Sequence, residues 1–271
     1  MSAIRRHSAI TSRLRTHIIR RIPTVIAVVA LLIIWEVWVR LGHVPATMLS
    51  APSEIVQATI VAWPTLWPAS LVTLIEGVSG FILAIVLGIL VGMALYCWRI
   101  FDAAFYPLLA AAQTLPLISI APLFLIWFGF EISGKIVIVA VFALFPIAVQ
   151  TVRGLQAVPG FYSDVALTCG ASPQWTLWHV KLRVAARQIF GGIRVSAAYI
   201  FATAATAEYL GARSGLGIWL QAAYNSFRTP LIFSATIVII VMTCAVMLLV
   251  NLTERLLLGP AGDDEDPDAG Q

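Results

Sequence analysis

Long apolar stretches dominate this chain and limit what it can fold into. Six segments are apolar over nearly their whole length, and they comprise residues 22–41, 70–96, 104–128, 134–152, 189–210 and 231–257. The hydrocarbon core of a bilayer requires about 20 residues of helix to cross it. A helix pairs its own backbone N–H and C=O groups, which have no water to bond with in the bilayer core. The sequence therefore predicts an all-α polytopic membrane protein with six transmembrane helices.

Charged residues are too few to cover a soluble domain of this size. They make up 11% of the 271 residues, and hydrophobic residues make up 60%. A soluble domain carries about 25% charged residues, so lipid must cover this surface. The net charge of +4 does not indicate nucleic-acid binding, because no basic stripe with interleaved aromatic residues is present.

The basic residues are distributed unevenly between alternate loops. With the N-terminus inside, twelve Lys and Arg residues fall on the cytoplasmic side and four on the outer side. This bias predicts that both termini face the cytoplasm. Residues 1–21 form a basic N-terminus, residues 22–258 the membrane domain, and residues 259–271 an acidic, disordered tail. The segment 22–41 is long enough to span and no cleavage site follows promptly, so we expect an uncleaved first helix.

The first outer loop is predicted at 42–69, with a short interfacial helix over 53–62 that Ser53 caps.

In the second span, small residues recur every four positions at Gly80, Ala84, Gly88 and Gly92. Such a stripe favours close helix packing, within the chain or between copies. The third span contains Pro107, Pro116 and Pro122, which predict bends or kinks.

Ionisable residues inside spans are candidates for function. Glu36 and Arg40 lie four apart, so we expect them to pair. We expect Glu76 to reach the outer interface and Arg194 to extend its side chain to the cytoplasmic interface. For Glu208, a structural hydrogen bond and a place in the transport pathway both stay open.

The sequence predicts no catalytic residues, metal site or cofactor. The four histidines and three cysteines are dispersed, without the spacing of a metal site or a disulfide framework. Residues 129–136 nearly match a phosphate-binding loop, but Ile136 replaces the required Ser or Thr. This segment also lies between two spans and faces outward by the charge count. We therefore expect no enzyme activity in this chain.

The cytoplasmic loop at about 154–187 is predicted to be structured. Residues 164–172 are typical of a helix that ends at Gly170, because glycine readily adopts the left-handed conformation that stops a helix. Ser172 then caps a second segment, in which Pro173 fits the first turn. Two short helices with a tight turn would form a protrusion that a soluble partner could bind, although an ordinary hairpin fits the same pattern.

This loop resembles the EAA loop of ABC importer permeases. Asp164, Val165 and Ala166 stand at the EAA positions and Gly170 at the family's glycine, while Arg183 stands where the family usually has proline. The resemblance implies a coupling helix that contacts the ATPase. The residues it assigns to coupling are Asp164, Ala166, Gly170, Ala171, Ser172, Val180 and Leu182.

Further motifs extend the resemblance over nearly the whole chain. They are Ala-Pro-Ser at 51–53, Gln-Thr-Leu-Pro at 113–116, Ala-Pro-Leu at 121–123, Trp-Phe-Gly at 127–129, Glu-Tyr-Leu-Gly at 208–211 and Gly-Leu-Gly at 215–217. Together they are similar to the nitrate/sulfonate/taurine group of bacterial inner-membrane permeases. The stretches 113–130 and 225–233 look more like its thiamine-pyrimidine-precursor branch than like its sulfonate branch. The resemblance implies the ABC importer permease (MetI-like) fold.

The resemblance also implies the partners and the solute. The expected partners are two ABC ATPase subunits, a second permease copy in a homodimer, and an extracytoplasmic solute-binding protein. The expected solute is a thiamine pyrimidine precursor or a related heteroaromatic, with sulfonate, taurine or nitrate as the alternative. A secondary transporter or channel is the alternative of another class, but the sequence has no convincing internal repeat.

Polar and aromatic residues near the spans are candidates for the solute pathway. These candidates are Gln113, Thr114, Trp127, Glu208, Tyr209 and Asn225. Amides and hydroxyls would hydrogen-bond a polar solute, and Trp127 and Tyr209 would stack on a flat ring. Helix packing and an interfacial aromatic belt are the competing structural explanations for the same residues.

Overall fold

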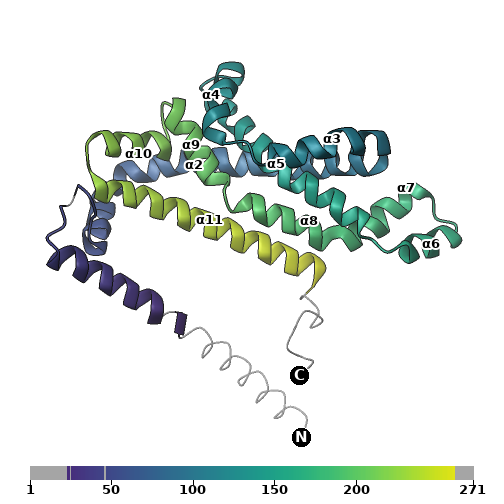
Figure 1. Ribbon diagram of the computed structural model, residues 1–271, viewed down its shortest axis with the longest axis horizontal. Coiled ribbons are helices and arrows are strands. Elements are labelled where there is room, and N and C mark those ends of the chain that lie inside the picture. The colour runs from purple at the N-terminus through teal and green to yellow at the C-terminus, as the bar shows by residue number, and fades with distance from the viewer. Residues whose placement is uncertain (1–22, 25, 46, 260–271) are drawn as a thin grey trace, which may run out of the picture. The chain divides into compact units, whose positions relative to one another are not determined.

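The computed structural model describes residues 23–24, 26–45 and 47–259 (Figure 1), and within these ranges the chain forms helices and no strand. Residues 23–24 and 26–41 are helical. The later helices are α2 (Pro52–Cys97), α3 (Arg99–Ala112), α4 (Leu117–Phe128), α5 (Ile132–Gln156), α6 (Gly160–Thr168), α7 (Pro173–Thr176), a π-helical turn η1 (Leu177–Lys181), α8 (Leu182–Ala197), α9 (Ile200–Gly211), α10 (Leu216–Asn225) and α11 (Thr229–Leu258).

The predicted all-α membrane architecture is confirmed. Four helical stretches of the described chain are long and apolar enough to cross a membrane, and the bent pair of α3 and α4 makes a fifth. These four are Pro52–Cys97, Ile132–Gln156, Pro173–Gly211 and Thr229–Leu258. The predicted first span begins outside the described residues, but 26–41 are helical. The basic N-terminus and the acidic tail from residue 260 also lie outside them.

Helix α2 is much longer than the sequence predicted. The expected outer loop at 42–69 and the separate short helix at 53–62 are wrong, because a single 46-residue helix starts at Pro52. This helix continues through Pro64 and Pro68. A proline removes one hydrogen bond from the ladder, whereas leaving the helix in lipid would expose several backbone groups. Continuing the helix is therefore the less costly solution.

The third and fifth predicted spans are interrupted. Between α3 and α4 the chain bends by 109°. Pro116 precedes α4 in an extended conformation, and proline also disfavours helical geometry at the residue before it. The predicted proline bend is thus confirmed as a full break. The fifth span is part of a longer helical stretch that begins at Pro173 and breaks after α8, at Ala198 and Tyr199.

The chain divides into two compact units. The first comprises the described residues up to Trp63 together with Ala223–Ser234. Within it, Arg40 pairs with Glu36 at 2.5 Å from Nε to Oε1, which confirms the predicted pair. Ser53 does not cap a helix of its own. Its backbone N–H and its hydroxyl both donate to the Glu36 carboxylate, at 3.0 and 2.7 Å.

The second unit, Pro64–Ala222 with Ala235 onward, contains the main core. There α5 packs against α8 and α9, and α4 packs against α9 (Figure 1). The small-residue stripe of α2 lies against α5. A Cβ at Gly80 would lie 2.6 Å from Val139 Cβ, and one at Gly88 would lie 2.8 Å from Ile147 Cγ2. The stripe therefore serves packing within the chain.

Arg194 has a partner that the sequence did not predict. Its guanidinium forms an ion pair with the Glu254 carboxylate of α11. Glu254 lies 60 residues later in the chain, so no local spacing could indicate this partner. The pair links α8 to α11 within the second unit.

The glycine contacts predict opposite effects of two Gly→Ala substitutions. Gly80→Ala should destabilise the protein by about 1–3 kcal/mol, because overpacking forces backbone and side chains to shift. Gly191 in α8 has open space where a Cβ would be, so Gly191→Ala should be neutral or stabilising by up to about 1 kcal/mol. Thermal unfolding of the two purified variants in detergent measures both effects. Equal melting temperatures would contradict the packing of α2 on α5.

Candidate functional site

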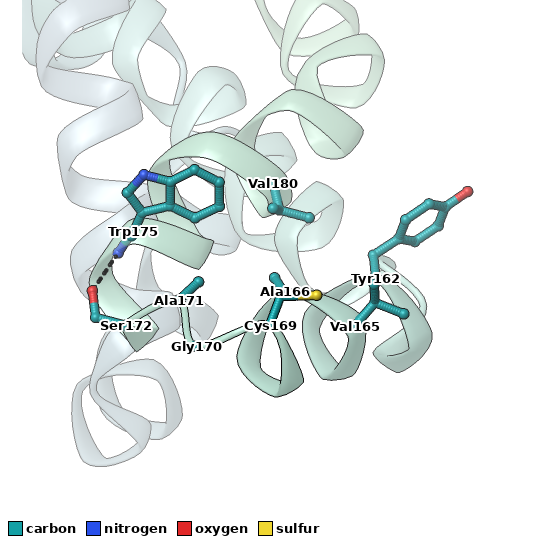
Figure 2. A pocket seen from close by; sticks show the side chains of 9 residues that line it. All are labelled: Tyr162, Val165, Ala166, Cys169, Gly170, Ala171, Ser172, Trp175 and Val180. Carbon is teal, nitrogen blue, oxygen red and sulfur yellow. Dashed lines mark hydrogen bonds between the residues drawn. The ribbon is translucent and has the colours of Figure 1, made fainter.

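The segment from α6 to η1 contains the tight turn predicted at Gly170 (Figure 2). Gly170 has φ +89°, a backbone conformation that favours glycine. Its N–H donates to the Leu167 carbonyl at 3.0 Å, and the Ala171 N–H donates to the Ala166 carbonyl at 3.1 Å. These two bonds form a Schellman motif, which satisfies carbonyls left free at the helix end. The predicted helix stop is confirmed.

Ser172 starts the second short helix as predicted. Its side chain accepts a hydrogen bond from the Trp175 backbone N–H at 3.2 Å, and Pro173 occupies the first turn of α7. A serine cap satisfies an amide that has no partner within the helix. Only residues 169–172 separate α6 from α7, and their hydrogen bonds give the turn a defined geometry.

A concave hollow of about 610 Å³ lies in the angle between α6 and the helices that follow (Figure 2). Its lining consists of Tyr162, Val165, Ala166, Cys169, Gly170, Ala171, Ser172, Trp175 and Val180. This set contains five of the seven predicted coupling residues. Of the other two, Asp164 is exposed on α6, whereas Leu182 is half-buried and packs against the main core. No charged side chain is among the lining residues.

The sequence analysis overlooked the aromatic residues of this segment. Phe161 and Tyr162 are 72% and 47% exposed, and Trp175 and Trp178 are 48% and 56% exposed. The Trp175 ring stacks on His179 with centroids 4.5 Å apart. Aromatic residues are enriched at protein interfaces. Their presence in a loop predicted to lie in the cytoplasm therefore indicated a surface for a protein partner. They make the surface around the hollow suitable for a protein partner.

Polar contacts connect this segment to the ends of the longer helices. Lys181 donates from Nζ to the Tyr96 hydroxyl at 2.8 Å and lies over the Tyr96 ring, 5.3 Å from its centroid. Tyr96 is near the end of α2. At the end of α5, Arg153 donates to the Tyr106 hydroxyl of α3 at 2.9 Å. Lys181 thus ties the segment to α2, and the second bond ties α5 to α3.

The predicted pathway residues do not share one of the described cavities. Gln113 and Thr114 are exposed at the break between α3 and α4, and Trp127 is 65% exposed on α4. Tyr209 is half-buried, and its carbonyl accepts from Gln221 at 3.1 Å. Asn225 is exposed at the end of α10.

Glu208 differs from the other candidates because its side chain is fully buried. Its carboxylate accepts from the Thr73 hydroxyl at 2.7 Å and from the Gly217 N–H at 2.6 Å. Of the two interpretations left open for Glu208, these contacts support the structural hydrogen bond.

The near match to a phosphate-binding loop has a structural explanation. Gly129 has φ +90° and ends α4. Lys135 is buried at the start of α5, and its ammonium donates to the Phe130 carbonyl. The lysine thus closes the turn between two helices, and it does not present its charge to a ligand at the surface.

Known proteins provide an independent comparison. Residues 84–258 match the family model described as "Binding-protein-dependent transport system inner membrane component". The riboflavin transport system permease protein RibX of Chloroflexus aurantiacus is 32% identical over 235 residues, which cover 86% of this chain and 88% of that protein. The formylaminopyrimidine transport permease protein ThiX of Halalkalibacterium halodurans is 30% identical, over 84% of this chain and 91% of that one. Other relatives are named as permeases for aliphatic sulfonates and taurine.

A solved structure supports the fold. The methionine ABC transporter MetNI, in an inward-facing conformation, has a chain that matches with a TM-score of 0.57 at 20% identity. The match covers 72% of this chain and 94% of that one. The predicted importer-permease architecture is therefore confirmed at the level of the fold.

The Ser172 cap predicts a local change in α7. Ser172→Ala should cost about 1 kcal/mol of local stability, because the Trp175 amide loses its acceptor. Ser172→Asp should retain the cap, since aspartate is an equally good N-cap residue. Hydrogen exchange at the Trp175 amide measures the difference, with about a fivefold acceleration expected in the alanine variant only. Equal exchange in the two variants would contradict the capping role.

Proposed function

The chain belongs to the family of inner membrane components of binding-protein-dependent transport systems, and on this premise we propose that it is the membrane-spanning permease subunit of an ATP-driven importer. The observation that carries the proposal is the family match over residues 84–258, which includes the whole hollow at Gly170. In this assignment separate ATPase subunits hydrolyse ATP, and this chain supplies the route through the bacterial cytoplasmic membrane.

The hollow is the proposed contact for the ATPase. It is concave, its lining has no charged side chain, and exposed aromatic residues surround it. An apolar concavity of this kind accepts an anchor side chain from a partner surface. The coupling set comprises Asp164, Ala166, Gly170, Ala171, Ser172, Val180 and Leu182. Leu182 belongs to this set although it is half-buried, because it packs against the main core and so supports the coupling segment.

The proposed energy transfer requires that the coupling contact differ between two states of the transporter. A partner can shift a conformational equilibrium only by its differential affinity for the states. Closure of the ATPase dimer would displace the hollow, and the contact between Lys181 and Tyr96 would carry that displacement to α2. Two permease copies, each bound to one ATPase, would then alternate between inward-open and outward-open states.

The proposed orientation puts the hollow and both termini in the cytoplasm. It rests on the excess of basic residues in the corresponding loops. A solute-binding protein would then deliver solute at the opposite face. A secondary transporter or channel, the alternative of another class, would not need a structured surface for an ATPase.

The proposed solute is a planar nitrogen heteroaromatic, such as a thiamine pyrimidine precursor. Two relatives, at 32% and 30% identity, are named for riboflavin and formylaminopyrimidine, and both compounds contain flat nitrogen-containing rings. Sulfonates and taurine form the second candidate class, because relatives at 29% and 25% identity are named for them. The two classes differ in charge and shape, so a direct uptake measurement separates them.

Cys169 provides a test of both the coupling contact and the orientation. It lines the hollow and is exposed. With Cys97 and Cys244 replaced by serine, a membrane-impermeant maleimide should label Cys169 in inverted membrane vesicles and not in intact cells. Adding the cognate ATPase should slow this labelling at least tenfold, because the partner covers the thiol.

The control is the same Cys169 variant mixed with an unrelated ATPase that does not bind it, which should leave the labelling rate of Cys169 within about twofold. Labelling of Cys169 from outside the cell would overturn the orientation. Labelling that the bound ATPase does not slow would overturn the coupling contact.

Uptake in a strain that lacks the gene tests the solute class. Loss of this permease should reduce uptake of radiolabelled formylaminopyrimidine at least tenfold and leave taurine uptake unchanged, and a plasmid copy should restore it. The opposite pattern, with taurine uptake lost and pyrimidine uptake retained, would assign the permease to the sulfonate class.

A further inference from the structure

The start of helix α10 is buried and needs hydrogen-bond partners from outside the helix. Leu216 is fully buried, and its neighbours Gly215 and Gly217 are buried as well. The first amides of a helix have no acceptor within it, and a buried amide without a partner costs several kcal/mol in lipid-like surroundings. Two side chains from other helices supply the acceptors.

Thr73 of α2 and Glu208 of α9 together cap this helix. The Leu216 N–H donates to Thr73 Oγ1 at 2.9 Å, and the Gly217 N–H donates to Glu208 Oε2 at 2.6 Å. The Thr73 hydroxyl in turn donates to Glu208 Oε1 at 2.7 Å. A carboxylate at a helix N-terminus is also favoured by the helix dipole. Both oxygens of Glu208 are therefore occupied by donors.

The glycines of the Gly-Leu-Gly motif make this arrangement possible. Gly215 has φ +116°, and a Cβ there would overlap the Glu208 carboxyl group. A Cβ at Gly217 would lie 2.7 Å from Glu208 Cβ and 2.6 Å from the Tyr209 nitrogen. Glu208 and the two glycines, separate motifs in the sequence, thus form a single capping unit.

A second carboxyl group lies beside this unit. Glu76 follows Thr73 by one turn on the same side of α2 and is fully buried. No donor among the described residues reaches either of its carboxylate oxygens. The neighbouring charged groups are the Glu208 carboxylate and the Lys135 ammonium of α5. Lys135 is itself buried, and its ammonium is bonded to the Phe130 carbonyl.

The charges of this cluster determine how many protons it can hold. If both carboxyl groups were ionised, the cluster would carry two negative charges and one positive charge away from water. A buried charge without a hydrogen-bond partner is costly, and Glu76 is the member that receives no hydrogen bond. Glu208, by contrast, accepts two hydrogen bonds that stabilise its ionised form.

We propose that Glu76 is a buried proton-binding site, whose neutral carboxyl donates to the Glu208 carboxylate and completes the cap of α10. One carboxylate and one ammonium then balance within the cluster. The proton on Glu76 becomes a further donor to Glu208, and the start of α10 is held to both α2 and α9. This inference concerns the permease chain alone and does not depend on how the ATPase binds.

Isosteric substitutions distinguish the two carboxyl groups. Glu76→Gln should be tolerated, because its amide N–H replaces the donated proton. Glu208→Gln should damage the cap, because an amide has one accepting oxygen where the carboxylate has two, so Thr73 and Gly217 can no longer both donate to it. Hydrogen exchange at the Leu216 and Gly217 amides of the purified permease measures the effect, with at least a tenfold acceleration expected for Glu208→Gln and less than twofold for Glu76→Gln.

Thr73 provides the matched pair that does not change a charge. Thr73→Val should accelerate exchange at Leu216 at least tenfold, whereas Thr73→Ser, which keeps the hydroxyl, should stay within about twofold of the natural protein. This pair tests the cap even if Glu208→Gln fails to fold. Equal exchange in the valine and serine variants would overturn the capping unit.

Infrared spectroscopy tests the proton directly. The natural protein should show the carbonyl stretching band of a protonated carboxylic acid at neutral pH. That band should be absent in Glu76→Gln and unchanged in Glu131→Gln, which alters an exposed carboxyl group. A band that persists in Glu76→Gln, or an exchange pattern in which Glu76→Gln is as damaging as Glu208→Gln, would overturn the assignment of the proton to Glu76.

Discussion

Unpaired backbone groups are very costly inside a bilayer, and this constraint explains where the helices of this protein begin and end. At the buried start of α10, Thr73 and Glu208 accept from the first amides. Helix α2 shows the same constraint in the opposite sense, since it continues through two prolines. Breaks occur where side chains or turns replace the lost hydrogen bonds.

Close packing joins the helices of the second unit, so that a movement of one helix can be passed to its neighbours. The glycine stripe brings the α2 backbone against α5, and α5 packs on α8. Lys181 fastens the segment around the hollow to Tyr96 near the end of α2. Tightly packed helices shift as units because their interiors do not compress readily. A force applied at the hollow would therefore act on α2, α5 and α8 together.

Local patterns predicted the parts of the structure that depend on neighbouring residues. The stop at Gly170 and the cap at Ser172 follow from the preferences of those residue types, and both predictions are confirmed. The pair of Glu36 and Arg40 followed from helical spacing. Three features depend on residues distant in sequence and could not be predicted in this way. They are the partner of Arg194, the burial of Glu76 and the continuation of α2 through its prolines.

The contacts of Glu208 also limit where a solute could bind on this chain. A solute that donated a hydrogen bond to Glu208 would have to enter a fully buried site and compete there with the Thr73 hydroxyl or the Gly217 amide. Losing that partner would leave a buried polar group unsatisfied, at a cost comparable to the new bond. Gln113 and Thr114, by contrast, are exposed at the break between α3 and α4. The hypothesis of polar solute contacts is therefore stronger at this break than at Glu208, whose carboxylate is already used to hold the helices together.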